Sequence, residues 1–162
     1  MAEPLQLLIV GDGPVTEALM QFVPVLGWSA SVSSARPAIG PDLDAVVITS
    51  HHEDVDGPTI KDALAAGTGY VGAMGSRRTQ ARRREWLLGN GVAEAALPAV
   101  HAPIGLDIGA DQPAEIALSI LAEIVGWRSG RLAASSTPAS IGDRSGPIHP
   151  ELAPGEATCP GG

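Results

Sequence analysis

The sequence predicts a single α/β domain built on a doubly wound, mostly parallel sheet. The first observation is residues 5–10, a continuous apolar run typical of a strand that is buried on both faces. The second is that such short runs alternate along the chain with segments whose apolar residues recur at helical spacing. Because parallel strands joined by helices need right-handed crossovers, this alternation indicates helices on both faces of one sheet.

The elements can be assigned in order. Helices are expected at residues 14–26, 58–66, 76–88 and 113–128, and strands at residues 5–10, 29–33, 43–49, 69–72 and 98–101. The last helix has the clearest signals, with Pro113 at its first position, Glu115 as a capping-box acid and Gly130 as its stop. If the first three strands form one half of the sheet, the strand order is 3-2-1-4-5, and the winding reverses between the first and fourth strands.

Residues 133–162 differ from the rest of the chain. They are rich in Pro, Gly and Ser and show no periodicity, so we expect a domain at residues 1–132 and a flexible tail at residues 133–162. Cys159 and His149 fall in this tail, which argues against a catalytic thiol or imidazole there.

Composition excludes several classes of protein. The 162 residues are 44% hydrophobic and only 3% aromatic, and the formal net charge of -8 disfavours nonspecific binding to nucleic acid. The single cysteine cannot form an intramolecular disulfide, and no Cys/His group has zinc-site spacing. Because the amino terminus lacks a basic signal region and no apolar run approaches about 18 residues, we expect a soluble cytoplasmic protein that does not enter membranes.

The loop after the first strand is the first candidate site. It reads Gly11-Asp12-Gly13-Pro14-Val15-Thr16, with glycines at the first two positions of a G-x-G-x-x-G fingerprint and Thr16 at the third. Gly11, Gly13 and Pro14 would let a phosphate approach backbone N–H groups at a helix start. The alternative is a plain tight turn.

The segment after the second strand has no acid for a ribose diol. It reads Ser33-Ser34-Ala35-Arg36-Pro37, and its hydroxyls with Arg36 suit a ribose 2′-phosphate, because a guanidinium binds phosphate through two hydrogen bonds. A solvated loop with one surface arginine is the alternative that we favour.

The start of the third helix is strongly basic. Half of the ten basic residues lie between positions 77 and 84. With Ser76 as N-cap after Gly75, free N–H groups and the side chains of Arg77 and Arg78 can converge on one anion, and we favour this interpretation. For residues 82–84 we favour a solvated helix face.

Two further loops carry titratable groups. Between residues 101 and 110, Gly105 helps to shape a loop whose fixed charge is Asp107. The Asp107 carboxylate could accept hydrogen bonds from ligand N–H groups or from neighbouring backbone N–H groups. His101 is either a base or a hydrogen-bonded structural residue. Residues 50–56 concentrate two histidines and three acids, which suits a hard-metal or acid-base site or, more commonly, helix-capping acids in a polar loop. We assign no metal ligand.

Two long motifs resemble the XdhC/CoxI family of accessory proteins for xanthine dehydrogenase and related molybdenum hydroxylases. They read Tyr70-Val71-Gly72-Ala73-Met74-Gly75-Ser76-Arg77-Arg78 and His101-Ala102-Pro103-Ile104-Gly105-Leu106-Asp107-Ile108-Gly109, and they are followed by residues 115–124. The similarity covers residues 5–131 and corresponds to the family's carboxy-terminal Rossmann-like domain. The chain departs from the family pattern at Ser34, where an Asp is common, and at Glu53, which follows His51 where a second histidine is usual.

The resemblance implies a non-catalytic role in the maturation of a molybdenum enzyme. Family members bind the molybdenum cofactor, protect it during sulfuration by a cysteine desulfurase and deliver it to the apo-enzyme, and many carry a further amino-terminal domain. We therefore expect a cofactor-binding accessory protein whose partners are the apo-hydroxylase, a desulfurase and, as a homodimer, a second copy.

Two alternatives stay open. One is an NAD(P)-dependent oxidoreductase, although Tyr70 and Lys61, the only tyrosine and lysine, form no Tyr-x-x-x-Lys pair. The other is a docking module without a ligand.

Overall fold

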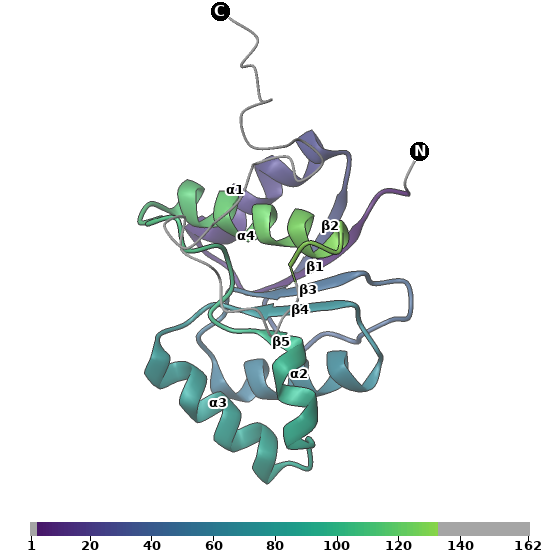
Figure 1. Cartoon of the computed structure of the whole chain (residues 1–162), viewed down its shortest axis with the longest axis vertical. Helices are drawn as coiled ribbons and strands as arrows, with labels where there is room; N and C mark the ends of the chain where they lie inside the picture. The colour runs from purple at the N-terminus through teal and green to yellow at the C-terminus, as the bar shows by residue number, and fades with distance from the viewer. Residues whose placement is uncertain (1–2, 133–162) are drawn as a thin grey trace, which may run out of the picture.

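A five-stranded parallel sheet in the order β2-β1-β3-β4-β5 forms the middle layer of the molecule (Figure 1). Its strands are β1 (Gln6–Val10), β2 (Ser29–Ser33), β3 (Ala45–Ile48), β4 (Tyr70–Ala73) and β5 (Val100–His101). The computed structural model describes residues 3–132. The expected tail at residues 133–162, with His149 and Cys159, lies outside the described residues.

Helices cover both faces of the sheet, which confirms the doubly wound α/β class. They are α1 (Pro14–Phe22), α2 (Glu53–Ala65), α3 (Arg77–Gly89) and α4 (Pro113–Arg128), with the short 3-10 helices η1 (Val23–Leu26) and η2 (Glu94–Ala99). In Figure 1, α1 and α4 lie together on one face, and α2 and α3 lie on the other. Alternate residues of the central strands fill two cores, as Ile9 on the α1/α4 side and Val10 on the α2/α3 side show.

The strand order differs from the expected 3-2-1-4-5, because β3 pairs with β1 and not with β2. Leu7 lies opposite Ala45 and Val10 opposite Ile48 in this pairing. The reason is burial: every residue of β3 is buried and apolar, so β3 needs a neighbour on each side, whereas the Ser-rich β2 is mostly exposed and suits an edge. The winding therefore reverses between β1 and β3.

Several element boundaries also differ from the expected ones. Helix α2 begins at Glu53, five residues before the expected start at Pro58. Its first turn is acidic and has no apolar periodicity, so the periodicity of the sequence did not indicate it. Acidic side chains nevertheless stabilise a helix start, because they interact favourably with the helix dipole. The expected helix at residues 14–26 is α-helical only to Phe22 and then tightens into η1. Helix α4 has the expected bounds and a complete capping box between Gln112 and Glu115.

Within residues 3–132, none of the helices has both the length and the apolar character that crossing a bilayer requires.

Candidate functional site

The candidate residues lie in the loops at the carboxyl edge of the sheet. Because all pairings are parallel, the segments that follow β1, β3, β4 and β5 leave the sheet at this one edge. Crevices at this edge are where open α/β sheets usually bind ligands.

Gly11 is a glycine because the end of β3 packs directly against it. A Cβ on Gly11 would lie 2.4 Å from Thr49 Oγ1 and 2.5 Å from the Ser50 backbone nitrogen, and its φ is 130°. Thr16, at the third fingerprint position, is buried, and its hydroxyl lies 2.8 Å from that of Thr49. A side chain at position 11 would therefore collide with Thr49 and Ser50, and the hydroxyl of Thr16 holds Thr49 from the other side.

Gly13 has a different role as the N-cap of α1. Its φ is 101°, and no atom of residues 3–132 lies within 4 Å of a Cβ built on it, so this side of the turn is open. Pro14 takes the first helical position, as expected. Because Pro14 has no N–H, the backbone donors at the start of α1 are those of Val15 and Thr16, which have no partner within the helix.

The start of α3 is capped by Ser76, as expected. Ser76 is the N-cap, and its Oγ accepts a hydrogen bond of 3.2 Å from the backbone N–H of Thr79. Arg77 and Arg78 are exposed, and their side chains form no ion pair or hydrogen bond within residues 3–132. Gly75 has a φ of 144°, and a Cβ there would lie 3.0 Å from Arg83 and from Thr79.

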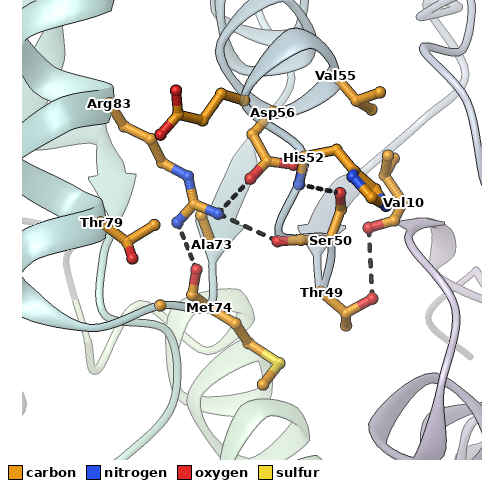
Figure 2. A network of polar contacts seen from close by, with 12 residues as sticks. Val10, Thr49, Ser50, His52, Val55, Asp56, Ala73, Met74, Thr79 and Arg83 are labelled. Carbon is orange, nitrogen blue, oxygen red and sulfur yellow. Dashed lines mark hydrogen bonds and ion pairs between the residues drawn. The ribbon is translucent and has the colours of Figure 1, made fainter.

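Arg83 is buried and joins four elements of the fold (Figure 2). Its guanidinium donates to Asp56 Oδ2 on α2 at 2.5 Å, to the Ser50 carbonyl oxygen after β3 at 3.2 Å and to the Met74 carbonyl oxygen after β4. Arg83 and Asp56 are 5% and 1% exposed. The network therefore fixes the loops after β3 and β4 relative to α2 and α3.

The expectation of a solvated face at residues 82–84 is wrong for Arg83. Arg82 and Arg84 do lie at the surface, in exposed ion pairs with Glu53 and Glu94. Arg83 points inward because α3 packs against α2, which places Arg83 over Asp56. Consecutive arginines have no polar and apolar periodicity from which the buried one could be identified. The only indication of a buried partner in the sequence is an acidic residue, Asp56, at a position that proved to be helical.

The two glycine turns lie at the same edge of the sheet but are not neighbours. Strand β3 separates β1 from β4, so Ser50 and Thr49 lie between the turn at Gly11 and the turn at Gly75. Contact between the turns passes through Ser50, whose nitrogen packs on Gly11 and whose carbonyl oxygen accepts from Arg83.

Arg36 points toward α2. Its Nε and Nη2 donate to Asp62 Oδ2 at 2.9 and 2.7 Å, in a pair that is half exposed. The guanidinium is thus already bound to a carboxylate on the surface.

The loop after β5 is shaped by backbone contacts. A Cβ on Gly105, whose φ is 98°, would lie 2.6 Å from Ser119 Oγ, and the N–H of Leu106 donates to the Ser119 carbonyl oxygen at 3.2 Å. Asp107 is exposed, and its carboxylate accepts no hydrogen bond within the described part of the chain. The loop therefore docks on α4 through Gly105 and Leu106.

His101 belongs to a buried polar group beneath α4. Its Nδ1 lies 3.0 Å from Glu123 Oε1, its ring stacks on Tyr70 at 4.3 Å, and the Tyr70 hydroxyl donates to the same carboxylate oxygen at 2.6 Å. Burial, followed by the charge and hydrogen bond of Glu123, raises the pKa of Tyr70 well above 10.0. The hydrogen-bonded, structural alternative for His101 is confirmed, and the tyrosine of the first long motif proves to be part of the same group.

The polar segment at residues 50–56 forms the start of α2. His51 and His52 are exposed, and Glu53, Asp54 and Asp56 lie in the first helical turn, as expected for acids at a helix start. No group of three or more His, Cys, Asp or Glu side chains within residues 3–132 could hold a metal ion.

Comparisons with known proteins identify the family of the chain. Residues 7–124 match the family described as the XdhC Rossmann domain. A probable xanthine dehydrogenase subunit of Bacillus subtilis is 29% identical over 150 residues, which cover 76% of this chain and 43% of the relative. The "Molybdenum cofactor insertion chaperone PaoD" of Escherichia coli is 28% identical over 128 residues, or 76% of this chain and 40% of that protein.

A solved structure is similar along the same region. The crystal structure described as a xanthine dehydrogenase from Bacillus halodurans has a TM-score of 0.66 and 25% identity, and the match covers 80% of this chain and 46% of the other. The chain thus spans less than half the length of these relatives. Because the family model covers most of the described sheet and its helices, the chain belongs to the XdhC family, and its described part is the Rossmann domain of that family.

Proposed function

We propose that the chain is an accessory protein in the maturation of a molybdenum hydroxylase of the xanthine dehydrogenase type. In this role it binds the molybdenum cofactor, or a related nucleotide-like anion, as cargo and contacts the apo-enzyme. One relative is a molybdenum cofactor insertion chaperone, and that relation supports the class of cargo.

The observation that carries the proposal is the start of α3. A molybdopterin ends in a phosphate or a pyrophosphate, and a helix N-terminus with outward-pointing arginines favours such an anion. Ser76 caps this helix, and Arg77 and Arg78 are exposed beside it in a chain of net charge -8. The backbone N–H groups of Val15 and Thr16, at the start of α1, offer a second group of donors two strands away, at the same edge.

Calorimetric titration tests the proposal directly. The full chain is titrated anaerobically with cofactor released from a molybdenum hydroxylase, and the Arg77→Ala and Arg78→Ala variants are compared with it. Each loss of a charge-assisted hydrogen bond should weaken binding about tenfold or more. Arg82→Ala is the matched control, because Arg82 lies on the same helix but already pairs with Glu53. Unchanged affinity in both test variants would remove the anion site.

The oxidoreductase alternative gains no support from the geometry at the end of β2. The guanidinium of Arg36, which would bind a ribose 2′-phosphate, is bound to Asp62. NADPH serves as the comparison ligand, with quenching of the three tryptophans as the readout. Saturable quenching would favour the oxidoreductase over the accessory role.

The partner part of the proposal has its own test. Purified apo-hydroxylase, a cysteine desulfurase and a second copy of the chain are the three expected partners. Pull-down with each, with and without the cofactor, distinguishes cargo-dependent delivery from a docking module without a ligand. Capture that is the same in both conditions would favour the docking module.

A further inference from the structure

A cavity of about 360 Å³ lies beside α3, on the side where the fifth strand ends the sheet. Its apolar walls come from four elements and include Ile60 of α2, Leu87 of α3, Leu97 of η2 and Val100 of β5. Cavities that hold small molecules begin at about 300 Å³ and combine apolar walls with a few polar groups. The size is therefore sufficient for one fused ring system.

All the charged side chains that line this cavity, among the described residues, are arginines. They are Arg77, Arg83 and Arg84, and the described lining contains no acidic side chain. Arg83 is neutralised by Asp56, and Arg84 by Glu94, whereas Arg77 has no acidic partner within the same part of the chain. Because Arg77 is also the first residue of α3, the positive end of the helix dipole adds to its charge.

A second cavity shows that this charge is specific to one side of α3. That cavity, of about 310 Å³, lies between α2 and α3 and is lined by the carboxylates of Glu53, Asp56 and Glu85 together with Arg82 and Arg83. Three acids against two arginines leave it net negative, so it disfavours an anion. Of these two cavities beside α3, the one near β5 combines apolar walls with an excess of positive charge.

The walls of the cavity near β5 are held in place by polar contacts. Gln80 Nε2 donates to the Ala73 carbonyl oxygen at 3.1 Å, which ties α3 to the end of β4. Arg84 pairs with Glu94 at 2.5 Å, which ties α3 to η2. A site that is already formed costs little ordering entropy when the ligand binds.

We propose that this cavity binds the ring system of a ligand whose phosphate is held by Arg77. The ligand class is a planar heterocycle joined to a phosphate. The inference rests on the proposed function for the nature of the cargo, and it adds that the ring lies between α3 and β5 and not over β1 and β3.

The test uses three probes on the full chain: guanosine 5′-monophosphate, guanosine and inorganic phosphate. Binding is followed by the methyl signals of Leu97 and Val100 in NMR spectra. The monophosphate should shift both signals, and Arg77→Ala should weaken it about tenfold while leaving guanosine nearly unchanged. Arg82→Ala is the matched control, since Arg82 lies on the same helix but pairs with Glu53 and does not line the cavity.

A steric variant separates the cavity from the anion site. Ala81 is exposed at the cavity mouth, so Ala81→Trp should block the monophosphate and guanosine alike, while Arg82→Trp, one residue along and facing α2, should not. The inference is overturned if about 10 mM monophosphate, far above ordinary ligand affinities, leaves the Leu97 and Val100 signals unmoved. It is also overturned if Ala81→Trp leaves the affinity unchanged.

The outcomes keep this inference apart from the proposed function. Loss of cofactor binding in both Arg77→Ala and Arg78→Ala, with no effect of Ala81→Trp, would support the accessory role and remove the cavity. Binding of the monophosphate in the cavity by a chain that does not bind the cofactor would support the cavity and remove the cargo.

Discussion

The guanidinium of Arg83 lies 2.5 Å from the carboxylate of Asp56, and neither side chain is more than 6% exposed. Such a pair contributes little net stability compared with apolar residues, yet the loss of one partner leaves a buried charge without compensation. The effect of substitution therefore depends on whether one or both residues change.

Arg83→Ala should lower the free energy of unfolding by about 3–5 kcal/mol, because the Asp56 carboxylate stays buried alone. Urea unfolding followed by tryptophan fluorescence measures this loss. Arg82→Ala, which breaks only an exposed pair with Glu53, should cost at most about 1 kcal/mol. The double variant Asp56→Leu, Arg83→Met should be more stable than Arg83→Ala. Equal losses for Arg82→Ala and Arg83→Ala would contradict the burial of Arg83.

Tyr70 should resist ionisation in the folded protein. Burial and the charge of Glu123 raise its pKa well above 10.0, and since it is the only tyrosine, the ultraviolet absorbance of tyrosinate reports on it alone. The neutral form is favoured in the folded state, so its contribution to stability is complete below pH 10 and is lost as the pH rises further. Native protein should titrate at higher pH than urea-unfolded protein, and coincident curves would refute the buried contact.

Gly11→Ala should destabilise the fold by more than a positive φ alone explains. The new methyl would meet Thr49 Oγ1 at 2.4 Å and the Ser50 nitrogen at 2.5 Å, which adds overpacking of about 1–3 kcal/mol to the backbone cost. Gly27→Ala is the control: its φ is 69°, no described atom lies within 4 Å of the new methyl, and the backbone cost is about 1–2 kcal/mol. Thermal unfolding of both variants gives the comparison, and equal melting temperatures would show that β3 does not press on Gly11.

Glu115 should make stability depend on pH in the acid range. Hydrogen bonds from the backbone N–H groups of Asp111 and Gln112 lower its pKa from the usual 4.5. Its contribution is therefore complete above pH 4.5 and is lost as the pH falls through the lowered value. The melting temperature of the wild type should fall more than that of Glu115→Gln between neutral and acid pH. Parallel curves would mean that the capping box adds nothing.

The fold class could be predicted because local signals agreed with it. Residues 5–10 carry the pattern of a buried strand, and residues 113–128 carry the pattern of a capped helix. The strand order could not be read from connectivity, because placing β3 beside β2 or beside β1 satisfies the same crossovers. Burial decides it, since Ala45–Ile48 is apolar throughout, and this signal was present in the sequence.

The candidate site was predicted only in part. Ser76 as an N-cap follows from local sequence, because serine immediately before a helix commonly accepts a hydrogen bond from a backbone N–H of the first turn. The burial of Arg83 and its pairing with Asp56 could not be predicted, because they depend on how α2 and α3 pack. The paired state of Arg36 depends on the same kind of long-range contact, here with Asp62.

The position of β3 between the two glycine turns limits what they can hold together. Neighbouring strands are about 4.8 Å apart, so the turns after β1 and β4 are separated by roughly 10 Å across the sheet. One phosphate group is too small to span that width. A molecule that touches both Gly13 and Ser76 must pass over Ser50 and must contact the two turns through different chemical groups.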